Sequence, residues 1–533
     1  MAPHHTKLPA RRDAPRGESP GFACAIAMSR RFASRAAWYH AGMKRLLAIA
    51  LVLAACDKTP ASPPERPERA EPAAARPSAA SADHARNPAE RAAHGATVDP
   101  CSKAAAEGSM VMPWIADDLP AALACARQRK VPVVIDEWAP WCHTCLSMQS
   151  TVFTDASFKP DVARFVFAAL DTDKEVNAAA VAKYPPSAWP TFYVIGEDRS
   201  TGAPDAVLAR FVGAASLAQF HAFLDAGVKA QQGGAAGADA HLLGAERATA
   251  VKDFATAEQE LTAALAQAPA EWTRRPDALT SLISTKRRRK DIAGCLEVAD
   301  KQLDATGNAA AATDFIVSAM MCADEAKSDA AQTAKVKRLR ERAAARLTKL
   351  VADDKAPLSV DDRSDALANL REIQDALGKH TEARATAERQ RALLDDAAAK
   401  ATAPMAAMTY NWQRCDVYTY LGRPLDLVPA LEKSARDLPH EYDPRARLGW
   451  IYLQAGKLPE AAKWTDEALA MVYGPRKARV LTQRVEIAQK QGDKDAEKKY
   501  RQQIVQLWES LPAGQANPEA LAKAKEALAA LDK

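Results

Sequence analysis

The stretch VPVVIDEWAPWCHTC occupies residues 131–145 and decides the fold of the first domain. Its first half is apolar and β-branched and is bounded by turn residues, which predicts a buried strand. Its second half ends in a Cys-x-x-Cys pair, and a helical pattern resumes directly afterwards, so Cys142 lies where a helix begins. Free backbone N–H groups and the helix dipole lower the pKa of a thiol at such a position and make it nucleophilic near neutral pH.

The spacing of the two cysteines suggests a redox mechanism. Cys145 lies one helical turn after Cys142, so its thiol can attack a mixed disulfide formed at Cys142. Two other roles would explain the pair: a structural disulfide without turnover, or two ligands of a zinc or copper ion. A Trp-Cys-x-x-Cys frame disfavours an inert disulfide, and the sequence has no second Cys-x-x-Cys or His pair to complete a metal site. We therefore predict redox exchange with no bound cofactor and no metal.

Around this pair the sequence resembles thioredoxin. The matching positions are two tryptophans, a buried acid, the cis-proline segment and the glycine after the last strand: Trp138, Trp141, Asp136, Trp189-Pro190-Thr191 and Gly213. The stretch from Cys145 to Asp155 is similar to the C-terminal domain of the periplasmic thiol:disulfide interchange reductase. The resemblance implies an α/β thioredoxin fold over residues 101–230.

The resemblance also implies a role for each residue of the site. Cys142 attacks, Cys145 resolves, Asp136 relays a proton to the resolving thiol, and Pro190 shapes the substrate groove. The other expected groove residues are Trp141, His143, Thr144, Trp189 and Gly213. The expected partners are protein thiols or disulfides and a further protein, not identified by the sequence, that transfers electrons to or from the pair.

Some positions depart from the family pattern. His143 and Thr144 replace a small Gly-Pro dipeptide, Ser150 replaces a helix-kinking proline, and no lysine accompanies Asp136. A cationic His143 would favour the thiolate and make the pair more oxidising, but its side chain could equally face solvent. The direction of electron flow therefore stays open.

The N-terminal region has the parts of a secretory signal: the charged start Met43-Lys44-Arg45, a short apolar run, and small residues before Cys56. The segment resembles the lipobox of bacterial lipoproteins, in which this thiol is diacylated and the chain is cut before it. The alternative is an unmodified Cys56 in an ordinary signal or anchor. Asp57 resembles a signal that retains some lipoproteins in the inner membrane. We expect a lipid anchor on the periplasmic side of a bacterial envelope.

A tether is expected to follow the anchor. Residues 57–100 contain eight prolines and no Phe, Trp or Tyr, so they hold too little apolar surface to offset the entropy of ordering. The net charge of +5 does not indicate a nucleic-acid partner, because residues 1–56 alone carry nine Lys or Arg against two acidic residues. The basic excess thus lies in a segment that we expect to be removed.

The C-terminal half is rich in Ala, Leu, Lys, Glu and Arg with helical periodicity, and contains an internal repeat. The clearest copy follows the spacing of a 34-residue tetratricopeptide repeat through Leu448, Gly449, Tyr452, Gly456, Ala461 and Ala468. An ordinary helical bundle is the alternative. Stacked hairpins form a surface for a peptide or protein partner, so we expect the array to bind one.

Two further disulfides are plausible from the positions of the remaining cysteines. Cys295 and Cys322 lie at nearly equal distances from a loop at Asn308, which would bring them opposite each other in a helical hairpin. Cys101 and Cys125 form a second candidate pair. Cys415 lies on an apolar helix face and is expected to be a buried small residue.

The sequence thus predicts a multi-domain chain with an α/β thioredoxin fold followed by an all-α tetratricopeptide-like array. The expected segments are an upstream non-native start (1–42), a signal peptide (43–55), a tether (56–100), the thioredoxin-like domain (101–230), a hinge (231–237) and the array (238–533). We expect a tethered thiol–disulfide oxidoreductase. The rival hypothesis is a lipoprotein adaptor whose array recruits partners and whose first domain only docks.

Overall fold

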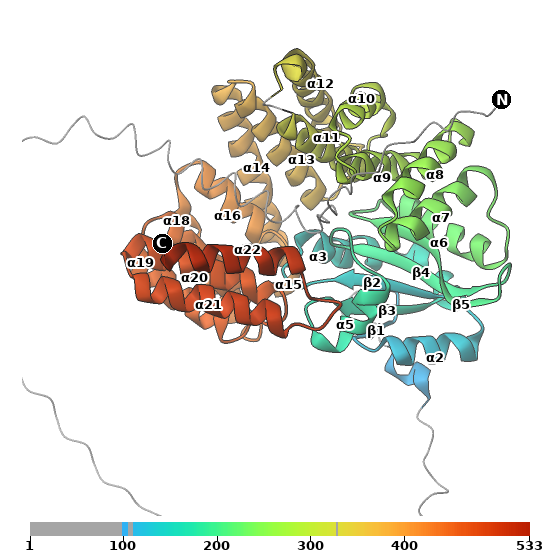
Figure 1. The fold of residues 1–533 in the computed structure, drawn as a ribbon, viewed down its shortest axis with the longest axis horizontal. Helices are drawn as coiled ribbons and strands as arrows, with labels where there is room; N and C mark the ends of the chain where they lie inside the picture. Colours follow the sequence, from blue (N-terminus) through green and yellow to red (C-terminus); the bar gives the residue numbers. More distant parts are fainter. Residues whose placement is uncertain (1–98, 105–109, 327–328, 533) are drawn as a thin grey trace, which may run out of the picture. The chain divides into compact units, whose positions relative to one another are not determined.

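The computed structural model describes residues 99–104, 110–326 and 329–532 (Figure 1). The expected upstream start, signal peptide and lipidation site at Cys56 lie outside these residues, as does almost all of the expected tether. In the described parts of the chain, no helix has both the length and the hydrophobicity needed to cross a bilayer. The described residues form a mixed β-sheet with flanking helices and then an all-α array, which confirms the predicted fold class.

The sheet has five strands in the order β1-β3-β2-β4-β5. Strands β1, β3 and β2 run parallel, whereas β4 is antiparallel to β2 and β5 is antiparallel to β4. The strands are β1 (Trp114–Ala116), β2 (Val133–Trp138), β3 (Val166–Asp171), β4 (Thr191–Asp198) and β5 (Ala203–Val212). The predicted buried strand is β2, and it lies at the centre of the sheet, which explains its apolar run: both of its faces are covered.

Helices pack on both faces of the sheet. They are α2 (Leu119–Arg129), α3 (His143–Ser150), α4 (Asp161–Arg164), α5 (Ala178–Lys183) and α6 (Leu217–Gln231). Alternate residues of β2 enter different apolar clusters. Val134 packs with Met148 of α3 and Phe220 of α6, whereas Ile135 packs with Leu119 of α2. Because side chains alternate along a strand, Asp136 points to the same face as Val134, which is the face that α3 covers.

The array begins after the short connection 232–236. Its helices are α7 (Gly237–Ala250), α8 (Phe254–Gln267), α9 (Arg275–Arg288), α10 (Ile292–Gln302), α11 (Ala310–Glu325), α12 (Thr333–Ala352), α13 (Val360–Ala376), α14 (His380–Lys400), α15 (Pro404–Met408), α16 (Asn411–Tyr420), α17 (Val428–Asp437), α18 (Asp443–Gln454), α19 (Leu458–Leu469), α20 (Arg476–Gln491), α21 (Lys494–Ser510) and α22 (Pro518–Ala529). Consecutive helices such as α7 and α8, α13 and α14, and α18 and α19 pack against each other as hairpins.

The clearest sequence repeat forms the α18–α19 hairpin. Gly456 has a φ of +73° at the turn between the two helices, a conformation that favours glycine. A Cβ atom at Gly449 would lie 2.4 Å from Thr465 Oγ1 on α19, so this glycine allows the close approach of the helices. Ala461 and Ala468 are fully buried on α19. The small residues of the repeat therefore lie where the two helices meet.

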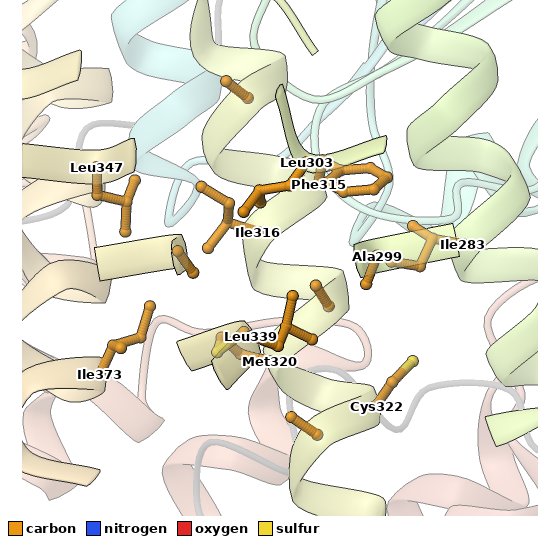
Figure 2. Packing of buried hydrophobic residues seen from close by; sticks show 14 of the residues in the cluster. Ile283, Ala299, Leu303, Phe315, Ile316, Met320, Cys322, Leu339, Leu347 and Ile373 are labelled. Carbon is orange, nitrogen blue, oxygen red and sulfur yellow. The ribbon is translucent and has the colours of Figure 1, made fainter. Parts of the chain in front are cut away.

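A large apolar cluster joins α9 to α13. Figure 2 shows Phe315, Ile316 and Met320 of α11 in the middle of this cluster, with Ile283 and Ile373 on opposite sides. At its edge a disulfide links Cys295 of α10 to Cys322 of α11, with 6.3 Å between their Cα atoms.

The structure also pairs Cys101 with Cys125, and their Cα atoms lie 4.9 Å apart. This bond ties the short 3-10 helix Pro100–Lys103 to α2. Cys415 is buried as a free thiol, and burial raises its pKa to about 12.

Candidate redox site

The Cys-x-x-Cys pair lies at the start of α3, as predicted. Cys142 is the N-cap residue, and its Sγ accepts a hydrogen bond of 3.0 Å from the backbone N–H of Cys145. The two sulfur atoms are bonded to each other, with 5.2 Å between the Cα atoms. Only 4% of Cys142 and 1% of Cys145 is exposed. In the reduced protein the same N–H group and the helix dipole would stabilise a Cys142 thiolate.

Two neighbouring acids are buried in β2, the strand that precedes this pair. Burial raises the pKa of Asp136 to about 8, and among the described residues its Oδ1 has no hydrogen-bond partner. A carboxyl group with this pKa exchanges a proton near neutral pH, which suits a proton relay. The sequence analysis missed Glu137, which points to the opposite face of β2. Burial raises its pKa well above the usual range, against the opposing charge of Arg210.

The predicted groove residues come together beside the disulfide. The peptide bond between Trp189 and Pro190 is cis, and the Pro190 carbonyl accepts a hydrogen bond of 3.0 Å from the N–H of Gly213. The Trp189 ring meets the Trp141 ring edge to face, with 5.1 Å between their centroids. Both rings border the cluster that contains Cys142 and Cys145. The structure therefore places Trp141 and Trp189 together beside the disulfide and Gly213 next to Pro190.

His143 does not face solvent as the sequence allowed. Its Nδ1 atom lies 3.0 Å from each carboxylate oxygen of Asp361, near the start of α13 in the array. Burial alone would lower the pKa of His143, but the carboxylates of Asp361 and Asp365 outweigh it and raise the pKa to about 9. Thr144 has its Oγ1 atom 3.4 Å from the same nitrogen. His143 is therefore held as an imidazolium between the two cysteines at neutral pH.

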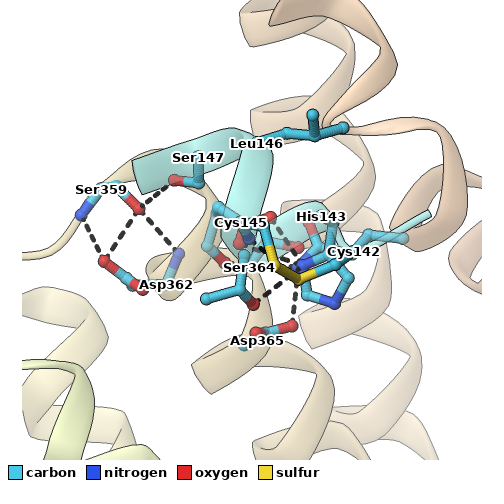
Figure 3. Close-up of polar contacts among 12 residues, drawn as sticks. Cys142, His143, Cys145, Leu146, Ser147, Ser359, Asp362, Ser364 and Asp365 are labelled. Carbon is cyan, nitrogen blue, oxygen red and sulfur yellow. Dashed lines mark hydrogen bonds and ion pairs between the residues drawn. A yellow bond between two sulfur atoms is a disulfide. The ribbon is translucent and has the colours of Figure 1, made fainter. Parts of the chain in front are cut away.

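The first turns of α13 face the start of α3 in Figure 3. Ser147 of α3 donates a hydrogen bond of 3.1 Å to Ser359, the N-cap residue of α13. His143, Asp361 and Asp365 each place one possible metal-ligand atom within 4.8 Å of the others. Because His143 Nδ1 is at hydrogen-bond distance from both oxygens of Asp361, a charged hydrogen bond accounts for this geometry.

Comparisons with known proteins bear on the first domain directly. Residues 114–194 match a family described as thioredoxin-like. This domain is thioredoxin-like. The match spans β1 to β4 and includes the Cys142–Cys145 pair and Pro190. The chain matches none of the curated proteins with which it was compared.

Solved structures that are similar to part of this chain include two helical proteins. One is a tetratricopeptide repeat protein from Parabacteroides merdae, 14% identical, with 56% of this chain and 99% of that chain covered and a TM-score of 0.35. Another is a Rap protein complexed with Competence and Sporulation Factor, 12% identical, with 58% and 81% covered and a TM-score of 0.30. In the structure itself, the helical hairpins and the close α18–α19 contact form a tetratricopeptide-like array after the thioredoxin-like domain.

Later helices of the array also contact the thioredoxin-like domain beside its disulfide. The guanidinium of Arg476 lies 4.3 Å from the centroid of the Trp141 ring, and Trp141 Nε1 donates a hydrogen bond of 2.6 Å to Asp173. Burial raises the pKa of Asp173 to about 7. Tyr473 donates a hydrogen bond to the carboxylate of Asp171. The tryptophan next to Cys142 is therefore in contact with the array.

A loop near the end of the chain completes this set of contacts. Gln515, between α21 and α22, donates hydrogen bonds of 2.8 and 3.0 Å to the carbonyl oxygens of Thr172 and Lys174. The sequence analysis located the redox pair and the groove residues but gave no sign of these contacts. Asp361 belongs to an acidic stretch that is typical of a helix N-terminus, so its pairing with His143 has no local signature.

Proposed function

We propose that the protein is a thiol–disulfide oxidoreductase that exchanges disulfides with protein substrates through Cys142 and Cys145. The observation that carries the proposal is the position of Cys142. Its sulfur caps α3, accepts the Cys145 N–H, and lies in one cluster with Cys145, Trp141 and Trp189. A thiolate at this position is stabilised by groups that are fixed before the reaction.

In the reducing direction the exchange has two steps. The Cys142 thiolate attacks a substrate disulfide, so a Cys142–substrate bond forms and one substrate sulfur leaves as a thiolate that takes up a proton. The Cys145 thiol then loses its proton and attacks Cys142 Sγ, which forms the Cys142–Cys145 disulfide and releases the second substrate thiol. Two electrons pass from the pair to the substrate, and a dithiol protein must return them. The oxidising direction reverses each step.

Asp136 is assigned the proton transfer at Cys145. Its pKa of about 8 lets it accept the proton of the Cys145 thiol and return it within the working pH range. Pro190 is assigned the substrate side, because it directly follows Trp189, whose ring packs against the cluster that contains the pair. These assignments need no bound cofactor.

The anchor, the location and the partner of the array belong to the same proposal. The lipobox-like sequence ending at Cys56 supports attachment to a membrane on the periplasmic side, and Asp57 favours the inner membrane. The array supports binding of a peptide or protein, because stacked hairpins expose an extended surface.

The test is a trapping experiment. With Cys145→Ala, attack by Cys142 continues but resolution is lost, so mixed disulfides with an unfolded, disulfide-bonded protein should accumulate. Cys142→Ala is the matched control and should give none. If Cys145→Ala and Cys142→Ala both give no reducible adduct after prolonged incubation, redox exchange is the wrong function.

A second candidate is an adaptor in which the thioredoxin-like domain only docks. The array's contacts on His143 and Trp141 favour it, because they cover the redox face. In that case, replacing both Cys142 and Cys145 by Ser should leave the thiol content of envelope proteins unchanged in cells. The oxidoreductase predicts that this thiol content shifts.

A further inference from the structure

We propose that the array is a cover over the redox site, and that a protein disulfide reaches Cys142 only after the array has moved away from Trp141 and α3. This inference rests on the proposed oxidoreductase function, since it concerns access to the same disulfide. It goes beyond that function by giving the array a role at the active site.

The cover touches residues on several sides of the disulfide. Asp361 holds His143, which lies between the two cysteines, and Ser359 bonds Ser147 on α3. Helix α15 also packs on α3. A substrate sulfur must reach Cys142 Sγ in line with the bond that breaks, so access is a requirement of exchange. Only 4% of Cys142 is exposed, so in this arrangement its sulfur is not accessible to a protein disulfide.

The connection between α19 and α20 covers the site on the side of Trp141. Arg476 stacks on Trp141, which also packs into the apolar cluster of Tyr442, Val472 and Val480. Trp141 directly precedes Cys142, so a substrate segment beside Pro190 and Trp189 would have to displace these contacts. The site that the thioredoxin-like domain offers to substrates is therefore occupied by its own chain.

Backbone contacts show how closely the two parts fit. A Cβ atom at Gly474 would lie 1.9 Å from the carbonyl oxygen of Asp173, and one at Gly514 would lie 1.9 Å from that of Ala178. On another side, a Cβ atom at the groove residue Gly213 would lie 2.9 Å from Asp314 Oδ2 of α11. At each of these three positions, a glycine allows the array and the thioredoxin-like domain to approach each other closely.

The contacts between the array and the site nevertheless permit the two parts to separate. Several of the contacts named above are hydrogen bonds or ion pairs, at His143, Ser147, Thr172 and Lys174, and polar interfaces between domains permit relative motion. The start of the array is fixed independently, because Glu246 of α7 accepts the N–H of Arg210 on β5 and pairs with Arg274. Repeat arrays contact only their neighbours along the chain, so later helices can shift while α7 and α9 stay in place.

The test replaces a glycine at the contact between the array and the thioredoxin-like domain in the full-length chain. Gly474→Ala places a methyl group against Asp173 and should force the cover open. Gly492→Ala is the matched control, because Gly492 has a similarly positive φ of +74° but no atom within 4 Å of the added Cβ. The readout is the rate at which a maleimide carrying a large polyethylene glycol chain labels Cys142 in the reduced protein, compared with N-ethylmaleimide.

The cover predicts that the large reagent labels the natural sequence and Gly492→Ala slowly relative to N-ethylmaleimide. Gly474→Ala should raise the rate for the large reagent by about tenfold to a thousandfold, the range expected when a minor open state becomes the main one. The proposal is overturned if the large reagent labels the natural sequence as fast as the small one. It is also overturned if the Gly474→Ala protein folds but is labelled by the large reagent no faster than the natural sequence.

If the Gly474→Ala protein does not fold, a less disruptive pair of variants tests the same proposal. Gln515→Ala removes the hydrogen bonds to Thr172 and Lys174, whereas Gln483→Ala removes bonds that lie within the array. Only the first should raise labelling. Labelling does not require turnover, so an opened variant that labels quickly but neither reduces a protein disulfide nor oxidises a protein dithiol would refute the oxidoreductase and leave the cover standing.

Discussion

Replacing Asp361 by Asn should remove the charge that keeps His143 protonated. The Asn side chain still fits between α13 and α3 and can accept a hydrogen bond, but it no longer offsets the cost of burying an imidazolium. The pKa of His143 should fall well below 9, because the burial that lowers it remains and only the carboxylate of Asp365 still raises it. The imidazole of His143 would then be largely neutral at pH 8.

The contribution of the ion pair to the folding free energy follows from the shift in the pKa of His143. A pKa of about 9 instead of the ordinary 6.5 corresponds to at most about 3 kcal/mol of folding free energy. Since the folded-state pKa is raised, this stabilisation is fully present below pH 6.5 and is lost as the pH rises through 9. Burial raises the pKa of Asp361 itself and reduces the net gain of the pair.

The assay is an NMR titration of the His143 ring, assigned with His143→Gln, together with urea unfolding at pH 6 and pH 9.5. The stability difference between the natural sequence and Asp361→Asn should be larger at pH 6. Asp375→Asn is the control, because Asp375 faces the exposed His380 at the same distance of 3.0 Å and should leave the His143 titration unchanged. A His143 midpoint near 6.5 in the natural sequence would refute the ion pair.

Three further predictions concern other parts of the chain. Replacing Cys295 and Cys322 by Ser should lower stability by roughly 3–4 kcal/mol in the chain-entropy account of a closed loop, while redox exchange continues; calorimetry with and without reductant measures this. Gly449→Ala should cost about 1–3 kcal/mol, because its Cβ would meet Thr465 at 2.4 Å, and a normal melting temperature would contradict the close packing. Mass spectrometry of the mature N-terminus should find acylated Cys56, and a terminus mapped elsewhere would end the lipoprotein hypothesis.

The sequence predicts the redox pair well because its pattern is local. Strand β2, the cysteines and the start of α3 lie within residues 133–150, so hydrophobic periodicity and the Cys-x-x-Cys spacing are sufficient. Pro190 required the resemblance to a known family, because its place beside the pair depends on the sheet. The α18–α19 hairpin was recognisable because its small residues follow the repeat, whereas the other hairpins retain fewer of them.

The contacts between the domains could not be predicted in this way. His143 and Asp361 are 218 residues apart, and Thr172 and Gln515 are 343 apart, so no spacing rule connects them. The glycines at 474 and 514 are typical of ordinary turns in sequence. Only the packing of the array against the sheet domain gives them a role in close approach.

In the proposed oxidoreductase, the contacts on Trp141 come from the same chain and would therefore act as an intramolecular competitor of a substrate. A tethered ligand presents itself at an effective concentration of about the millimolar range. A protein disulfide present at micromolar concentration therefore competes poorly unless other binding energy favours the separated state. A partner that binds the array only in that state would supply this energy. By thermodynamic linkage, a substrate bound at Cys142 would then raise the affinity of the array for that partner by the same factor.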